Sequence, residues 1–509
     1  MRYLFTNLLL LVLLPIGLQA QGHHSCGTNP SIEGFAQQKA RLLRNIRQAA
    51  SGTTTVRNTT YVPVKFHIGA RNDGSGRLNP QRVLDQLCEL NEDFASLDIQ
   101  FFLADGEINF INNTTFYTDH FSTQFSVMNP NRDPRAMNVF IVENANTGVG
   151  GGGGTVLAYY IPARDWIVIT KTYVDKDDAT LSHEVGHFFS LLHTFNGWEC
   201  GDYNVENVPA PANSCDGVPT EYADGSNCNT AGDFICDTPA DYNNGSGWNN
   251  CNFTLNILDP QGDPIDPDER NYLSYFLNCP EDEYFFSDQQ IAAMRADIES
   301  VDRNYLFFDP VPTYVTIDGP STNISPADGE VTEGYNIVEF EWEAVPGATS
   351  YLFELDRVSS FSISPIRIIT EENSLVLETL DPDRRYHWRV RPFNAHIGCA
   401  DNSETTDFRT GEGLVNTATP TEVDAFSVAP NPIVGENELN VYLSTTEAFF
   451  GQVELLDLNG RTTAIRQAFE FTVGENRLNL DLSNLPNGIY FLRINGLTGT
   501  LTQKVILAR

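Results

Sequence analysis

Eleven residues of the chain, HEVGHFFSLLH at 183–193, hold three of its nine histidines. His183 and His187 are four residues apart, so on an α-helix their imidazoles lie on one face and can reach a common point. Glu184 lies beside them, and this H-E-x-x-H spacing is that of a helical zinc site with the glutamate as general base. Catalytic zinc takes three protein ligands and keeps one position open, and His193 is the candidate third ligand. The helix must then end before His193, because the chain has to turn back toward the metal.

A chance match is the alternative, in which the histidines pack or hydrogen-bond within an ordinary core. A third histidine at the one further required position lowers the odds of chance roughly fifty-fold, because nine histidines are spread over 509 residues. We therefore favour a zinc site with His183, His187 and His193 as ligands and Glu184 as the base.

The first twenty residues, MRYLFTNLLLLVLLPIGLQA, have the pattern of a secretory signal peptide. Arg2 gives the positive start, Leu8–Leu14 the apolar run, and Ala20 the small residue at a cleavage point. That run is too short to cross a membrane, and we expect no transmembrane segment elsewhere. Export places the chain in a compartment that permits disulfides.

The charge balance argues against two classes of partner. The chain has 67 acidic and 31 basic residues, a formal net charge of -36. Nucleic acids and anionic membranes bind surfaces rich in lysine and arginine. We expect no nucleic-acid partner and interpret the acidity as the solvated surface of an exported protein.

The nine cysteines fall into one cluster and three single positions. The cluster follows the histidines and is predicted to form disulfides, but six cysteines allow 15 pairings and the spacing does not choose among them. Cys88 lies among apolar residues at helical spacing, and we predict a buried core thiol there. Cys399 stands alone in a later region, and Cys26 stands alone near the start. The clustered cysteines are Cys200, Cys215, Cys228, Cys236, Cys251 and Cys279.

Residues 58–305 mix strands with helices, which indicates an α+β or α/β domain. One predicted helix has Pro80 in its first turn, and another begins with Ser287 and Gln290 placed as a capping box. Residues 21–57 are polar with one predicted helix, and we interpret them as a pro-segment ending in a linker. The expected strands are YVPVKFHI at 61–68, DIQFFLA at 98–104, NVFIVE at 138–143, TVLAYY at 155–160 and DWIVIT at 165–170.

After about residue 312 the helical periodicity disappears, and short alternating strands separated by Gly, Pro and Asp predict β-sandwiches. In 312–412, Trp342 in an early strand and Tyr386 in a late one resemble a fibronectin type III domain. The block 423–509 has a PNP turn, a D-x-x-G turn and an L-x-x-G-I-Y strand. It resembles the C-terminal sorting domain of the type IX secretion system. The resemblance implies that this block engages the bacterial outer-membrane secretion machinery and is removed afterwards.

Four segments carry a wider resemblance over residues 61–300: TLSHEVGHFFSLLHTF, GSNCNTAGDFICDTPAD, NYLSYFLNC and FSDQQIAAM. Together they resemble the pappalysin family of metzincin metalloproteases, whose zinc motif is H-E-x-x-H-x-x-G-x-x-H. The resemblance implies a secreted zinc endopeptidase acting on proteins or peptides. It also implies a multidomain fold, an α+β metzincin-like catalytic domain followed by two all-β sandwich domains. The strand TVLAYY is then expected to pair with an extended substrate at a sheet edge.

Two residues depart from the metzincin pattern. Ser190 stands where the motif has glycine, which suits a turn with positive φ at a helix end. Serine costs about 1 kcal/mol there and supplies no ligand, so we expect it to be tolerated. Leu273 stands where metzincins have a methionine beneath the metal, and Leu for Met nearly conserves volume. Tyr275 matches a family tyrosine near the zinc, with a role in stabilising the tetrahedral intermediate or only in the core.

The resemblance adds three further expectations. Cys26, in the sequence SCGT, is a candidate latent-state zinc ligand, with a stray thiol or disulfide partner as the alternative. Calcium is expected near the cysteine cluster as a structural ion, with Asp233 and Asp237 as candidate ligands unless they are simply solvated loop acids. Asn278 stands where relatives selecting a basic residue carry an acid, which argues against that preference.

Two other functions remain open from the sequence. A catalytically decayed metzincin could act as an extracellular adhesion or binding protein, an idea that only Ser190 and Leu273 favour. A zinc hydrolase of a non-peptide substrate is the other, and the expected sheet edge counts against it. All three candidate ligands and Glu184 are intact, so we favour the peptidase.

Overall fold

The structure is a computed structural model of the 509-residue chain. The signal peptide predicted at 1–20, the glycine run at 148–154 and Asn278 lie outside the residues that it describes. Described residues are 24–28, 32–52, 59–146, 155–244, 251–275, 279–280, 283–307, 313–378, 380–412, 423–435, 437–457, 461–495 and 500–508.

By their internal contacts the residues group into two compact units. The first comprises residues up to 324 together with 341–374 and 387–406. The second comprises 325–340, 375–386 and 407–509. The strands between 325 and 406 therefore contribute to both units.

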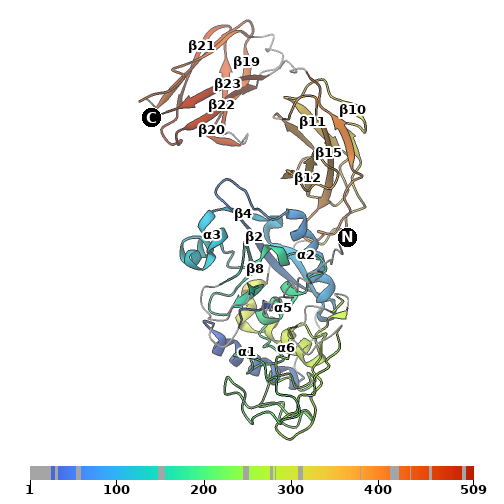
Figure 1. Ribbon diagram of the computed structural model, residues 1–509. Helices are drawn as coiled ribbons and strands as arrows, with labels where there is room; N and C mark the ends of the chain where they lie inside the picture. The colour runs from blue at the N-terminus through green and yellow to red at the C-terminus, as the bar shows by residue number, and fades with distance from the viewer. Residues whose placement is uncertain are drawn as a thin grey trace, which may run out of the picture. The chain divides into compact units, whose positions relative to one another are not determined.

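A mixed six-stranded sheet organises the N-terminal part of the first unit (Figure 1). Its order is β3-β2-β5-β8-β7, and β4 pairs with β2 off this path. All pairs are parallel except β7 with β8, so the sheet ends on an antiparallel strand. Both β5 and β8 are buried at every position, as expected of central parallel strands covered on two faces. The bounds are β2 Thr60–Ala70, β3 Ile99–Leu103, β4 Asn109–Asn112, β5 Met137–Val142, β7 Ala158–Ile161 and β8 Trp166–Thr170.

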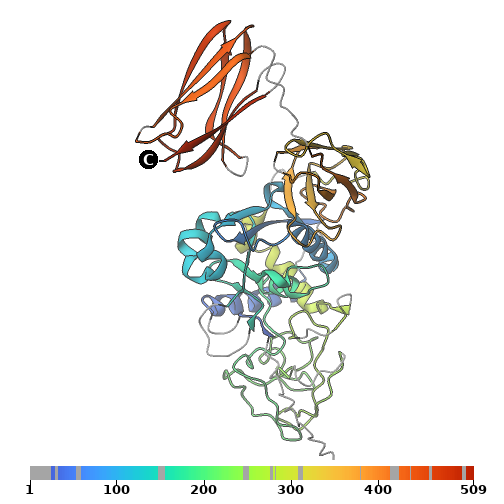
Figure 2. The same cartoon turned by 45° about the horizontal axis from the view of Figure 1, so that its top comes forward.

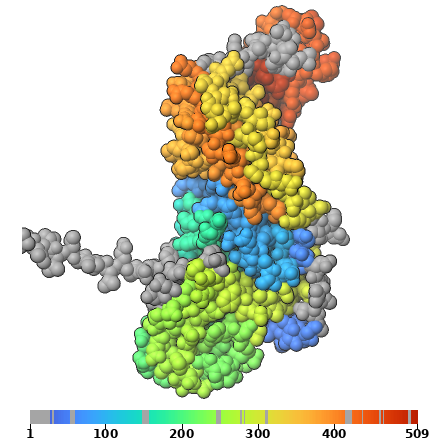
Figure 3. All heavy atoms as spheres, turned by 90° about the vertical axis from the view of Figure 1, so that its right-hand side faces the viewer, coloured from blue at the N-terminus to red at the C-terminus, as the bar shows by residue number. Residues whose placement is uncertain are grey.

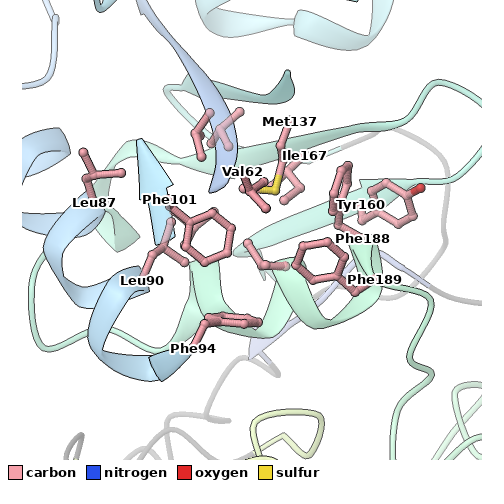
Figure 4. Packing of buried hydrophobic residues seen from close by; sticks show 14 of the residues in the cluster. Val62, Leu87, Leu90, Phe94, Phe101, Met137, Tyr160, Ile167, Phe188 and Phe189 are labelled. Carbon is pink, nitrogen blue, oxygen red and sulfur yellow. The ribbon is translucent and has the colours of Figure 1, made fainter. Parts of the chain in front are cut away.

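Helices α2 (Pro80–Asp93) and α5 (Thr180–Phe188) pack their apolar faces on one side of this sheet. Figure 4 shows Leu90 and Phe94 from the α2 region and Phe188 from α5 directed at the strand residues. On the opposite face Phe140 and Trp166 pack with residues of α3 (Thr114–Thr118) in a separate core cluster. Successive side chains of β5 point to opposite faces of the sheet, so the strand contributes residues to both core clusters.

The predicted helix starts are confirmed. Pro80 begins α2, and the Asn79 side chain caps it by accepting from Gln81 N at 3.0 Å. Helix α6 (Asp288–Ile298) begins with the predicted capping box between Ser287 and Gln290. These are local signals, and local sequence was enough to place them.

The segment between α5 and α6 consists mostly of turns and isolated bridges stapled by disulfides. Its cysteines pair as Cys200–Cys215, Cys228–Cys236 and Cys251–Cys279, which confirms disulfides in the cluster. In Figure 3 the segment forms one continuous green to yellow-green mass. Cross-links of this kind hold irregular loops in place where regular hydrogen-bonding ladders are short.

The prediction of a free core thiol at Cys88 was wrong. Cys88 is buried as expected, but it forms a disulfide with Cys399, 311 residues later in the sequence and within the same unit. A cysteine on the buried face of a helix satisfies the spacing argument in either state, so periodicity could not separate them. Cys26 is left as the free cysteine of the nine.

All-β structure follows, as predicted. Strands β9 (Asn323–Ser325) to β16 (Thr406–Arg409) form a five-stranded sheet, β10-β16-β15-β12-β13, and a three-stranded sheet, β14-β11-β9. Trp342 on β11 and Trp388 on β15 are fully buried between them. The other strand bounds are β10 Glu330–Val331, β11 Val338–Trp342, β12 Ser350–Asp356, β13 Ile366–Thr370, β14 Ser374–Leu377 and β15 Arg385–Phe393.

The last seven strands form a second sandwich with a core of its own (Figure 2). Its sheets are β17-β18-β21 and β20-β19-β22-β23. Alternating burial along β18 and β22 gives each sheet one apolar inner face. The bounds are β17 Val423–Ala429, β18 Glu438–Thr445, β19 Phe449–Leu456, β20 Thr462–Phe471, β21 Gly474–Asp481, β22 Gly488–Asn495 and β23 Thr500–Leu507.

Removing the long-range disulfide should destabilise the first unit. We expect Cys88→Ala with Cys399→Ala to lower the free energy of unfolding by about 2–5 kcal/mol, because the open chain gains conformational freedom when unfolded. Peptide mapping without reductant should recover the two cysteine-containing peptides as one linked species. Recovery of separate peptides with free thiols would contradict the pairing.

Candidate metal centre

Helix α5 and the turn after it bring the three predicted histidines together. His183 and His187 lie one helical turn apart, and α5 ends at Phe188. Ser190 then adopts a φ of 77°, which reverses the chain and returns His193 to the helix. The Nε2 atom of His187 lies 3.1 Å from Nε2 of His183 and 3.1 Å from Nε2 of His193. All three rings are buried.

The hydrogen bonds of His183 and His187 leave their Nε2 atoms free to bind a cation. His183 Nδ1 lies 2.5 Å from the Tyr272 carbonyl and His187 Nδ1 lies 2.9 Å from the Leu191 carbonyl. A carbonyl only accepts, so both Nδ1 atoms carry the proton and both Nε2 atoms present lone pairs. Burial lowers the pKa of His183 to about 4, and burial with the neighbouring histidines lowers the pKa of His187 well below its usual value, so both rings are neutral.

Nitrogen lone pairs that face one another need a positive ion between them. Tetrahedral zinc with bonds of 2.0–2.1 Å separates its nitrogen ligands by about 3.3 Å, close to the spacing seen here. The residues present therefore fit the ion that the sequence pattern predicted.

Cys26 and Glu184 complete the centre. The sulfur of Cys26 and the three imidazoles offer ligand atoms that all lie within 4.8 Å of one another. Glu184 is fully buried, with its Oε2 3.3 Å from the Thr28 hydroxyl. Burial raises the pKa of Glu184 to about 8, and burial with the nearby Glu184 charge raises the pKa of the Cys26 thiol. Both groups thus favour their neutral forms until a positive charge is present.

The segment carrying Cys26 lies along the strand expected to bind substrate. Strand β1 (His24–Ser25) pairs in parallel with β6 (Thr155–Val156). Gly27 N donates to Ala158 O at 2.9 Å, and the Thr28 hydroxyl accepts from Tyr160 N at 2.8 Å. The strand β7, which ends the sheet, is thereby covered by the chain's own N-terminal residues.

Helix α1 (Phe35–Ala50), from the same predicted pro-segment, contacts the end of α5 and the turn that follows it. Gln38 Nε2 donates to His187 O at 3.2 Å and to Leu191 O at 2.8 Å. Asn45 Nδ2 donates to Ser190 Oγ at 2.9 Å. The serine at position 190, where the motif has glycine, therefore has a hydrogen-bond partner on α1, Asn45. The motif alone does not predict this contact.

Leu273 supports α5 directly, in the place where the sequence predicted apolar support. Its side chain is fully buried, and a Cβ added to Gly186 would lie 2.8 Å from Leu273 Cδ2 and 3.2 Å from Phe286 Cε1. Gly186, between the two histidines on α5, thus lies in close contact with the turn that carries Leu273. Tyr275, two residues on, donates its hydroxyl to the Cys26 carbonyl at 2.9 Å, and its ring centroid lies 5.0 Å from that of His193.

One set of buried contacts was missed by the sequence analysis. Asp241 accepts from Thr194 Oγ1 at 2.7 Å and from Ser274 Oγ at 3.0 Å. It thereby joins the residue after His193 to the turn that carries Leu273. Asp241 ends the CDTPAD segment, and nothing in its spacing predicts which loops it bridges.

The two candidate calcium ligands lie in separate hydrogen-bond networks. Asp233 is buried and accepts from Ile235 N and from the Thr238 hydroxyl. Asp237 accepts from Ser287 Oγ at 2.6 Å at the start of α6. Neither belongs to a cluster with metal-ligand spacing in the described part of the chain.

Comparison with known proteins identifies the C-terminal region of the chain. Residues 427–508 match the family described as the secretion system C-terminal sorting domain. The protein is therefore a secreted one, as predicted. Among the described residues, no helix combines the length and apolarity needed to span a bilayer.

Several curated relatives are fungal. An extracellular metalloprotease of Colletotrichum graminicola is 30% identical over 225 residues, which cover 40% of this chain and 77% of that protein. An extracellular metalloprotease of Verticillium alfalfae is 29% identical over 228 residues, covering 40% and 77%. One from Neurospora crassa is 27% identical over 220 residues, covering 38% and 73%.

Solved structures of fibronectin domains are also similar to this chain. FN3tt matches at 18% identity and a TM-score of 0.15, over 19% of this chain and 100% of that chain. The chicken CNTN1 FN1–FN3 domains match at 18% identity and a TM-score of 0.15, over 38% and 69%.

The contact between Gly186 and Leu273 predicts opposite outcomes for two substitutions. Gly186→Ala should destabilise the domain by about 1–3 kcal/mol and lower its metal content, because the new methyl group displaces α5 from the turn. Leu273→Met nearly conserves volume and should change stability by less than about 1.5 kcal/mol. Thermal unfolding and metal analysis of both variants check this, and equal behaviour of the two would contradict it.

Proposed function

The chain belongs to the family of extracellular metalloproteases, and on that premise we propose that it is a secreted zinc-dependent endopeptidase. The observation that carries the proposal is the convergence of three imidazole Nε2 atoms beside the buried Glu184. His183, His187 and His193 would hold the ion. We assign the activity to residues 58–305, with 312–412 as a fibronectin-like domain and 423–509 as the region that engages the secretion machinery.

Glu184 is proposed as the general base. A zinc ion held by the histidines would supply Lewis acidity to the scissile carbonyl and lower the pKa of water at the site. Glu184 lies next to that position, takes the proton of the attacking water and passes it to the leaving amine. The Tyr275 hydroxyl, which here donates to a peptide carbonyl, is placed to donate to the oxygen that becomes negative in the tetrahedral intermediate.

Substrate is proposed to bind as an extended strand along β6 and β7. The support is the segment 24–28, which already lies there: its backbone bonds to Ala158, and the Thr28 hydroxyl bonds to the backbone of Tyr160. Main-chain hydrogen bonds of this kind give affinity without selecting a sequence. The same contacts mean that substrate and residues 24–28 compete for one edge.

Residues 21–57 are accordingly proposed as an inhibitory pro-segment. Cys26 would occupy the fourth position of the ion, and a thiolate is a good zinc ligand. Thr28 contacts Glu184 and α1 contacts the turn at Ser190, so the segment is held at several points. Latency then ends when the segment is cut and released.

A structural calcium ion remains a proposal. Its support lies in a buried acidic group in which Glu221 Oε2 accepts no hydrogen bond among the described residues. Burial and the charges of Asp233 and Asp241 raise the pKa of Glu221 to about 9. A divalent cation there would relieve that repulsion.

Glu184→Gln tests the central proposal in the processed, secreted protein. We expect kcat/KM on an unfolded protein substrate to fall about 10²–10⁴-fold, because the amide cannot take a proton, while bound zinc stays at one per chain. Glu92→Gln, an exposed change on α2, is the matched control and should keep wild-type activity.

The outcomes of that experiment separate the competing functions. Zinc in wild type without cleavage of any protein substrate would favour the binding protein with a decayed catalytic site. Full activity in Glu184→Gln would overturn the assignment of the base. Absence of zinc from the wild type would overturn the metal site itself.

Cys26→Ser tests latency in the unprocessed protein. Loss of the sulfur ligand should raise activity before any cut, toward the level of the processed enzyme. Thr28→Val removes a hydroxyl from the same segment but keeps the thiol, and it should stay more latent than Cys26→Ser. Unchanged latency in Cys26→Ser, measured as peptide cleavage per intact chain, would rule out the sulfur as the latch.

A further inference from the structure

The third histidine differs from the other two in what its outer ring nitrogen faces. His183 and His187 each donate Nδ1–H to a backbone carbonyl. For His193, no carbonyl in the described part of the chain accepts from Nδ1. A carboxylate oxygen, Glu199 Oε1, lies 3.6 Å from this nitrogen.

Glu199 is held so that one oxygen points at that ring. Its side chain is only 4% exposed, although glutamate is seldom buried without a partner. Gly197 N donates to Oε2 at 2.7 Å, which fixes the carboxylate in the loop after His193. The other oxygen, Oε1, is buried and accepts no hydrogen bond from the described residues. The bond from Gly197 N explains why Oε2 is buried, but it does not explain why Oε1 is buried.

Burying an acceptor without a donor costs about 1–3 kcal/mol, so an unused Oε1 calls for a function. A separation of 3.6 Å lies just beyond a hydrogen bond, and a slight rotation of the imidazole closes it. An ion at the common point would bind His193 through Nε2, which leaves the ring proton on Nδ1 as the donor. A carboxylate in this position fixes the ring orientation and makes the imidazole a stronger ligand, which a carbonyl does less well.

We propose that Glu199 is a positioning residue for the metal centre, accepting the Nδ1 proton of His193 and strengthening that residue as a ligand. The inference rests on the proposed zinc site. It also gives the centre two carboxylates, Glu184 and Glu199, whose charges match a divalent ion. His193 follows a turn and lies outside α5, so it is the ligand that most needs an anchor of its own.

The test is zinc affinity of the full chain, measured by competition with a chelator. Glu199→Gln keeps the size of the side chain and its bond to Gly197 but loses the charge. We expect zinc to bind about 10–100-fold more weakly, with an unchanged melting temperature for the zinc-free protein. Glu206→Gln is the matched control, because Glu206 is an exposed glutamate in the same loop segment, and its zinc affinity should equal that of wild type.

Two further readouts keep the outcome decisive. The visible spectrum of the cobalt-loaded protein should change in Glu199→Gln and stay the same in Glu206→Gln, because only Glu199 acts on a ligand, His193. Glu199→Asp keeps the charge at a shorter reach and should recover part of the affinity if Glu199→Gln folds poorly. Wild-type zinc affinity in Glu199→Gln, or a lower melting temperature without zinc and no change in affinity, would overturn the proposal. A wild-type chain that binds no zinc would instead overturn the proposed function.

Discussion

The turn that brings His193 back to α5 is the constraint on which the rest of the centre depends. Two histidines on one helix face are easily arranged, but the third ligand requires the helix to stop and the chain to reverse within a few residues. Ser190 makes that reversal in a conformation that disfavours any residue with a Cβ. The surrounding loops hold it there: Asp241 joins Thr194 to the turn at Ser274, and Leu273 packs on Gly186. The ligands are thus positioned by elements from three separate parts of the chain.

The sequence predicted the parts of this structure that depend on local signals. Helix α2 follows from Pro80 and its apolar stripe, and α6 follows from the Ser287 capping box, because both signals act within one turn. The convergence of the histidines also followed from their spacing, since helical geometry alone carries two of the three ligands.

What the sequence could not predict are the contacts between distant segments. The pairing of Cys88 with Cys399 depends on how a helix and a later strand region meet, and periodicity reports only that Cys88 faces inward. The roles of Asp241 and Asn45 depend on the paths of irregular loops and of a separate helix. The sequence does not show which acidic loop residues are buried. Asp233 and Asp237 were therefore predicted as calcium ligands, whereas the positions of Glu199 and Asp241 near the histidines were not predicted.

The contacts of the predicted pro-segment are compatible with a site that stays formed when the segment leaves, as the proposed latency requires. Gln38 bonds to the Leu191 carbonyl, but that oxygen has a second lone pair that already serves His187. Arg41 pairs with the buried Asp297, which keeps Arg303 as a partner when Arg41 leaves. These two acceptors, the Leu191 carbonyl and Asp297, therefore keep a partner without residues 21–57. In the proposed latency, release of residues 21–57 would uncover the strand edge and would leave in place the Tyr272 and Leu191 carbonyls that accept from His183 and His187.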